Sequence, residues 1–521
     1  MSACGPESPG DRASDESRTL LETDPSALIT PAQGALPPGL PSRLLVGLFE
    51  DNGQTWMKTS GVPWDVRYRY LTKGWINNWG WSPADGSFAL QYMRESAAQG
   101  AIPAVQFYQL NAEPGGGEAQ FLAKTQNSTT MKSYFSDFKV LMQRAKDFGQ
   151  PVFVLVEADG FGLLQQQTKG NPQVQAAVAA TGLPELAGLP NTVAGWGLAF
   201  LQLRKAVGAN NVVLGLHVSA WASDKDIAYF SVTEPLQPEV DKVHAFLKPF
   251  GLGTNVTGAT YDVLVGDPLD RDSDFYVRTR SQNRWWDASD SASLSSASFN
   301  RYAEWLRLWN VTAGKRWVLW QIPEGNSHHL NVDNQDGPRQ GYKDNRAEYF
   351  FGPSGAGHRE KFASAGVIAL MFGRGEGKQS SHLNDVYTDG QLFLKSRAGA
   401  FLRAGGLVLP GGSTTPPPTN PEPPPTTPGD DAAPFHFESG TQGWAFSGAL
   451  VSGVSSSTTR AFAGSRSLEV KLAGGASGTS RVFVSESAPV PGDTVAFQVW
   501  VPAGHLLSGV QPYVQQGAAG G

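Results

Sequence analysis

The chain has almost no cysteine, little charge and no long apolar run. Its 521 residues include one cysteine, Cys4, which excludes an internal disulfide framework. Charged residues make up 17% of the chain and the formal net charge is -6, so no basic face is available to neutralise a phosphate backbone. No apolar stretch is long enough to span a bilayer. We therefore expect no nucleic-acid partner and no membrane-spanning segment.

A tract rich in Pro and Thr, STTPPPTNPEPPPTTPGDD, begins at Ser413 and divides the chain unequally. Residues 1–41 are rich in Pro, Ser, Asp and Glu without periodicity, which predicts a disordered tether. We expect one large domain over 42–408, a linker over 409–433 and a smaller domain over 434–521.

The residues around Cys4 indicate export. Ser2, Ala3, Cys4 and Gly5 resemble the end of a bacterial lipoprotein signal, in which a small pair precedes the lipidated cysteine. The apolar stretch that should come before it is missing, as if the sequence began partway through the signal. The alternative is an incidental cysteine in a disordered tail. We expect a secreted or cell-surface monomer that touches a membrane only through a lipid anchor at Cys4.

Eight regularly spaced apolar runs rich in Val, Ile, Leu and aromatic residues predict strands. They begin at Arg43, Val66, Ala101, Pro151, Asn211, Tyr261, Arg316 and Gly366. The intervening segments 86–100, 130–149, 189–211 and 296–315 place apolar residues three and four apart, which predicts helices; Asn191 or Thr192 could cap the third. No Gly-rich loop follows the first run, which disfavours a doubly wound sheet. The fold class predicted is α/β, a closed (β/α)8 barrel.

Four acids follow these runs where a barrel gathers its reactive side chains, at the carboxyl ends of the strands. Glu157 and Asp159 follow the fourth run, Asp267 the sixth and Glu324 the seventh. Strand alternation puts Glu157 and Asp159 on one face and Glu324 on the face of Trp320. Paired carboxyls suit glycoside hydrolysis, because one protonates the leaving oxygen while the other stays ionised.

The layout resembles the clan of retaining glycoside hydrolases on a (β/α)8 barrel that includes many cellulases and β-mannanases. The resemblance implies a retaining endo-β-glycosidase acting on a polysaccharide, with Glu157 as acid/base, Glu324 as nucleophile and about 5 Å between their carboxyls. Two positions depart from the clan pattern. Val156 stands where an asparagine usually precedes the acid/base, and Asp267 follows the sixth run, where a tyrosine is common.

Three alternatives remain open. A second barrel clan, which hydrolyses α-glycosides, places a nucleophilic aspartate after strand four and an acid/base aspartate after strand six; Asp159 and Asp267 match those places. Asp159 could also be central, with Glu157 supporting it. The third alternative is a non-catalytic carbohydrate-binding protein on a degenerate barrel.

Other residues near the predicted strand ends suit sugar recognition, because flat aromatic faces stack on sugar rings and polar groups bind hydroxyls. The alternative for each is a core contact or a loop hydrogen bond. The candidates are Glu50, Asp51, Asn52, Trp79, Tyr108, His217, Trp221, Trp285, Trp286, Trp320 and Gln321.

Short alternating runs after the linker predict an antiparallel β-sandwich. The stretches Phe437 to Trp444 and Gly464 to Val470 resemble carbohydrate-binding jelly-roll modules, and we expect the module to be incomplete. The resemblance implies that a structural calcium could bind near Glu438. We expect no other cofactor or metal, since the adjacent His328 and His329 cannot share one face and no spaced ligand cluster accompanies them.

Overall fold

The computed structural model describes residues 32–80, 83–110, 117–229, 235–289, 297–325, 342–373, 392–409, 437–459, 465–474 and 478–484. Cys4, His328, His329 and most of the predicted linker lie outside these residues. The chain divides into two compact units, Met1–Pro418 and Thr419–Gly521, and each is described by itself.

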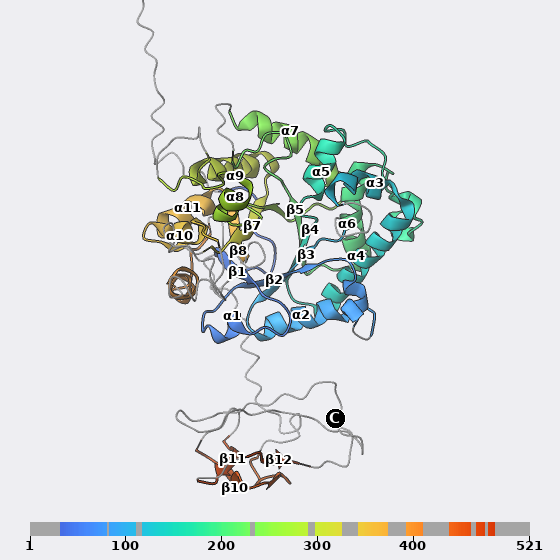
Figure 1. The fold of residues 1–521 in the computed structure, drawn as a ribbon. Coiled ribbons are helices and arrows are strands. Elements are labelled where there is room, and N and C mark those ends of the chain that lie inside the picture. Colours follow the sequence, from blue (N-terminus) through green and yellow to red (C-terminus); the bar gives the residue numbers. More distant parts are fainter. Residues whose placement is uncertain are drawn as a thin grey trace, which may run out of the picture. The chain divides into compact units, whose positions relative to one another are not determined.

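Eight parallel strands close a barrel in sequence order, with β8 paired to β1 (Figure 1). This confirms the predicted (β/α)8 barrel, and each apolar run supplies one strand. The strands are β1 Leu45–Phe49, β2 Val66–Leu71, β3 Ile102–Phe107, β4 Val152–Val156, β5 Val212–His217, β6 Val263–Gly266, β7 Arg316–Pro323 and β8 Val367–Gly373.

Helices surround the strands as an outer ring (Figure 1). The four predicted helices correspond to α2, α4, α6 and α9. The α-helices of the first unit are α1 Trp56–Thr59, α2 Ser87–Ala98, α3 Phe121–Gln126, α4 Ser128–Phe148, α5 Gly160–Gln167, α6 Val193–Val207, α7 Gln237–Leu247, α8 Ser273–Arg280, α9 Phe299–Ala313, α10 Arg346–Phe351, α11 Gly355–Ser364 and α13 Ala398–Arg403. None of the helices within the described ranges is long and apolar enough to cross a membrane.

An aromatic layer fills the space between the barrel and helices α4 and α6. The ring of Phe107 on β3 lies 5.2 Å from that of Tyr134 on α4, which stacks at 6.3 Å on Trp196 of α6. Trp196 in turn meets Phe200 edge-on at 5.0 Å. Aromatic burial of this kind dominates core energetics, so this layer fixes α4 and α6 against the strands.

The second unit contains two antiparallel pairs, β10 Val451–Ser457 with β11 Ser467–Leu472 and β9 Ala445–Ser447 with β12 Arg481–Phe483. Both pairs are consistent with the predicted β-sandwich. The Glu438 carboxylate accepts hydrogen bonds from the backbone N–H groups of Ser465 and Arg466, at 2.7 and 2.9 Å. Among the described residues no three His, Cys, Asp or Glu side chains lie close enough to hold a metal ion, so calcium stays a prediction.

The N-cap of α6 gives a stability prediction. Thr192 Oγ1 accepts the Gly195 N–H at 3.1 Å, which satisfies one of the unpaired donors of the first turn. Thr192→Ala should therefore lower the free energy of unfolding by about 1 kcal/mol, measured by denaturant titration. Thr129→Ala, at an exposed position in the first turn of α4, should change it by less than about 0.5 kcal/mol. Equal losses in the two variants would contradict the capping role.

Candidate functional site

Aromatic and polar side chains form the floor of the barrel mouth. Tyr70 of β2 lies opposite Gln106 of β3 in the sheet register. The Trp320 ring lies 5.5 Å from that of Tyr70 and 5.2 Å from the imidazole of His217. His217 Nε2 is 2.9 Å from Gln106 Oε1, and burial lowers the pKa of His217 to about 3, so its ring is neutral. The predicted binding residues His217 and Trp320 therefore meet inside the barrel.

Two aspartates that follow strands lie at this mouth, Asp159 after β4 and Asp267 after β6. Burial raises the pKa of Asp159 to about 6, although the hydroxyl of Tyr108, which donates to Asp159 Oδ2 at 3.0 Å, opposes the shift. Burial, then the charges of Asp270 and Asp159, raises the pKa of Asp267 well above its ordinary value. The buried Asp267 Oδ1 has no hydrogen-bond partner in the part of the chain that the structure describes. The two carboxyls are thus electrostatically coupled.

A hydrogen-bonded chain joins the floor to the loop after β6. Tyr70 donates its hydroxyl to Gln321 Oε1, and Gln321 Nε2 donates to the Asp270 carbonyl at 2.7 Å. The Asp270 carboxylate pairs with Arg271 and accepts from the Tyr276 hydroxyl. Sequence reasoning selected Gln321 but missed Tyr70, Asp270 and Arg271. Asp270 and Arg271 closely follow Asp267 in the sequence, and this proximity could have identified them as candidates.

Glu157 lies behind the strands, where the alternation prediction is wrong. Its φ is 44°, and its side-chain Oε1 accepts from the Gln109 and Leu110 N–H groups, both at 3.0 Å. The hydroxyl of Tyr134, on α4, donates to the same oxygen at 2.9 Å. The left-handed backbone turns the carboxyl away from the barrel axis, into the aromatic layer beneath α4.

Glu324 follows β7 and is buried, with its N–H bonded to the Gly373 carbonyl at 3.1 Å. A bulge between Leu319 and Ile322, where Gln321 has a φ of 55°, interrupts the alternation used to orient Glu324. Burial, then Tyr70 and Glu324, raises the pKa of Tyr68, an inward residue of β2. Glu324 therefore lies near the mouth, and its catalytic role stays a prediction.

Two predicted binding residues have structural partners instead. Glu50 is fully buried and accepts from Arg67 Nε at 2.9 Å and the Met57 N–H at 2.8 Å. Trp286 is 3% exposed; its Nε1 donates to the Ala228 carbonyl at 2.7 Å, and the Arg346 guanidinium lies 4.4 Å from its ring centre. Neither side chain is available to a ligand, because Glu50 is ion-paired with Arg67 and Trp286 is packed against Arg346.

The remaining predicted binding residues are divided between two places. Trp221 and Trp285 are half-buried, in the loops after β5 and α8, and stay predictions. Asp51, Asn52 and Trp79 gather around Arg69, on the outer face of β2.

No protein-family model matches the chain, and no curated protein sequence matches it. Solved structures do resemble it. A modular endo-β-1,4-mannanase from Cellulomonas fimi has 14% identity and a TM-score of 0.39, covering 74% of this chain and 78% of that one. A GH26 β-mannanase from Bacteroides ovatus has 11% identity and a TM-score of 0.36, covering 71% of this chain and 92% of that one. At TM-scores this low the similarity carries no argument about activity.

The buried Glu157 carboxyl gives a pH prediction. Burial raises its pKa from 4.5 to about 7, despite the hydrogen bonds that it accepts. The folded state then binds this proton more tightly than the unfolded state, so stability should fall by about 3 kcal/mol as pH rises from about 4.5 to 7. Glu157→Gln keeps an acceptor oxygen without the charge, and its unfolding free energy should lack this slope.

Denaturant titrations at several pH values would measure the difference. The control is Glu360→Gln, at an exposed position on α11, which should keep the wild-type slope. Parallel pH profiles for wild type and Glu157→Gln would show that the buried carboxyl does not titrate in this range.

Proposed function

We propose that the barrel is a glycoside hydrolase that cleaves a polysaccharide at its mouth, with Asp159 and Asp267 as the reacting pair. The observation that carries this proposal is the pair itself: two carboxyls whose pKa values are raised by burial follow β4 and β6, above a floor that contains Trp320 and Tyr70. Aromatic faces beside hydrogen-bonding groups suit sugar rings.

The two acids would take different roles. The charge of Asp159 is among the causes that raise the pKa of Asp267, which favours Asp267 as the acid that keeps its proton while Asp159 is ionised. Asp267 then protonates the leaving oxygen, and ionised Asp159 attacks the anomeric carbon or activates water.

This pair is the one expected for the second barrel clan, in which aspartates after strands four and six react. The position of Glu157 suits the other alternative, in which Glu157 supports a central Asp159. Glu324 is the second candidate partner for Asp159, because its charge reaches Tyr68 on the inner face of β2. Asp159 follows β4 and Glu324 follows β7, the two strands that carry the reacting acids in the retaining clan. Product stereochemistry followed by NMR would show whether the configuration at the anomeric carbon is retained or inverted, and hence whether the pair is close or widely spaced.

Substitution of Asp159, Asp267 and Glu324 tests the proposal. Asp159→Asn and Asp267→Asn should each lower hydrolysis on the order of 10²–10⁴-fold, because each removes a proton-transfer or nucleophilic group. Glu324→Gln, assayed in parallel, would identify the partner of Asp159. The substrates should include β-glucan, glucomannan, xylan and α-glucans. The control is Asp147→Asn, at an exposed position on α4, which should leave activity unchanged.

The wild-type rate should rise as Asp159 ionises near pH 6 and fall as Asp267, whose pKa is raised well above its ordinary value, loses its proton. Full activity in either aspartate variant would contradict the proposal that Asp159 and Asp267 are the reacting acids. Binding without hydrolysis across the whole panel would favour a non-catalytic carbohydrate-binding barrel.

We further propose export, lipid anchoring at Cys4 and a monomeric state, with the second unit holding the enzyme near its polymer and so raising the effective substrate concentration. The Ser2–Gly5 motif supports the anchor. In cells that carry the natural gene, labelled palmitate should be incorporated into the wild-type protein and not into Cys4→Ala. Equal labelling of both would exclude this anchor, and light scattering would give the mass in solution.

A further inference from the structure

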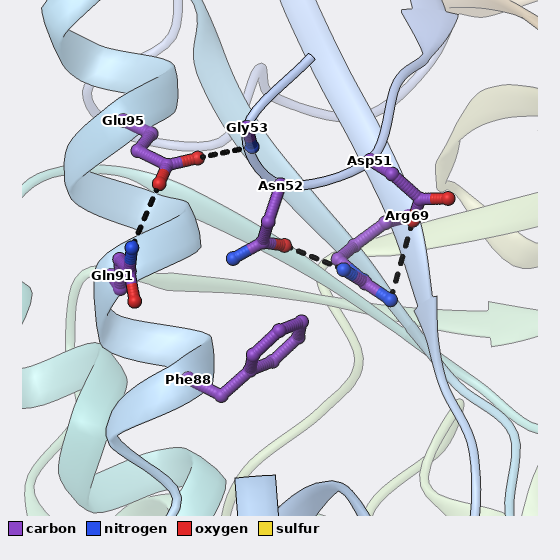
Figure 2. A pocket seen from close by; sticks show the side chains of 7 residues that line it. All are labelled: Asp51, Asn52, Gly53, Arg69, Phe88, Gln91 and Glu95. Atoms are coloured by element: carbon purple, nitrogen blue, oxygen red, sulfur yellow. Dashed lines mark hydrogen bonds and ion pairs between the residues drawn. The ribbon is translucent and has the colours of Figure 1, made fainter. Parts of the chain in front are cut away.

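A pocket of about 320 Å³ lies on the outer side of β2, between that strand, the loop after β1 and helix α2 (Figure 2). Its volume is at the lower end of the roughly 300–1,000 Å³ range of small-molecule sites, which suits a single ring better than a chain. The pocket is lined by Asp51, Asn52, Gly53, Arg69, Phe88, Gln91 and Glu95.

Strand β2 separates this pocket from the barrel mouth. Tyr70 points into the barrel, where its ring meets Trp320 at 5.5 Å. Its neighbour Arg69 points the other way, with its guanidinium 4.5 Å from the ring centre of Phe88 on α2. Neither Asp159 nor Asp267 lines the pocket. The pocket is therefore a different site from the one assigned to catalysis.

The charges in the pocket select against anions. Arg69 is paired with Asp51 at 3.3 Å, and its Nη1 donates to Asn52 Oδ1. Glu95 accepts from Gln91 Nε2 at 3.0 Å and from the Gly53 N–H at 3.3 Å. The lining has a formal charge of -1, and Arg67, 3.6 Å from Glu95, is itself paired with Glu50. Both guanidinium groups are thus already paired with carboxylates, which disfavours a phosphate, sulfate or uronate group. A neutral ligand with many hydroxyls meets both donors and acceptors here.

One donor in the pocket is left without a partner. Asn52 Nδ2 is buried, and no group among the described residues accepts its hydrogen bond. Figure 2 shows this nitrogen turned toward α2 and away from Arg69. An unsatisfied buried donor costs about 1–3 kcal/mol, which a ligand oxygen would recover if the Asn52 amide turns toward the pocket on binding. Trp79, 39% exposed and 4.6 Å from the Phe88 ring, adds a flat aromatic face close to the pocket.

We propose that this pocket is a second carbohydrate-binding site, which takes one neutral sugar ring of the polymer while another part of the same polymer lies at the mouth or is free. The choice of a polysaccharide as the ligand rests on the proposed function. The pocket contributes avidity rather than chemistry, because attachment of the polymer at one point raises its effective concentration at the other.

Asn52→Asp tests the site. The substitution keeps an oxygen for Arg69 and the side-chain shape, but replaces the unpaired donor with a repelling acceptor. Gln91→Trp, at an exposed helix position, tests it differently by filling the pocket. The control is Asn171→Asp, an exposed residue whose Oδ1 accepts the Gln173 N–H at 3.0 Å; it makes the same charge change and keeps an acceptor.

Each substitution is placed in the full chain together with Asp159→Asn, so that binding is measured without hydrolysis. Affinity electrophoresis through glucomannan, barley β-glucan, xylan and starch gives the dissociation constants, and thermal melting confirms folding. Asn52→Asp and Gln91→Trp should weaken binding to at least one polymer tenfold or more, while Asn171→Asp should match the parent. Unchanged binding in folded Asn52→Asp and Gln91→Trp, with all four polymers, would overturn the site.

The two proposals fail separately. Loss of polymer binding in the pocket variants supports the second site even if the wild-type protein hydrolyses nothing, which would reject the catalytic proposal alone. Hydrolysis by wild type with no effect of the pocket variants on binding rejects the second site alone.

Discussion

The buried carboxyl of Glu157 fixes the geometry on which the candidate site depends. One oxygen accepts hydrogen bonds from Gln109, Leu110 and Tyr134, and so ties the chain leaving β3 to β4 and α4. Tyr108 immediately precedes this anchored segment and reaches Asp159 with its hydroxyl. The left-handed backbone at a non-glycine residue costs about 1–3 kcal/mol and persists only where the surroundings enforce it. Here three donors and an aromatic layer supply that enforcement.

The barrel interior near the mouth is lined by polar and aromatic side chains. Barrel interiors are commonly filled by branched aliphatic side chains. Near the mouth this one instead contains Tyr70, Gln106, His217 and Trp320, which are joined by ring contacts and the His217–Gln106 hydrogen bond. The hydrogen bonds of His217 to Gln106 and of Tyr70 to Gln321 hold these two rings in fixed orientations, although Gln106 Nε2 and Trp320 Nε1 are buried without a partner among the described residues. A ligand therefore meets a surface that is already arranged.

The sequence predicted the barrel well because strands buried on both faces appear as nearly continuous apolar runs, and amphipathic helices separate them. It predicted the rim less well. Alternation assumes extended backbone, and it failed at Glu157 and Gln321, where φ is positive and no glycine marks the change. Glu50 was selected for its place at a strand end, but its partner Arg67 lies on the next strand, a pairing that only the folded register reveals. Asp159 and Asp267 were found because they follow strands in the sequence, although the left-handed residue Glu157 lies between β4 and Asp159.

Strand β2 presents Tyr70 to the barrel interior and Arg69 to the outer pocket, one peptide apart. Its backbone is hydrogen-bonded to β1 on one side and β3 on the other, which resists displacement from either face. Side chains on the two faces can then be replaced independently, whereas a substitution that moves the strand changes the side-chain positions on both faces. Odd and even positions of this strand are thus free to evolve apart, so that the proposed outer site can change while the proposed catalytic site is conserved.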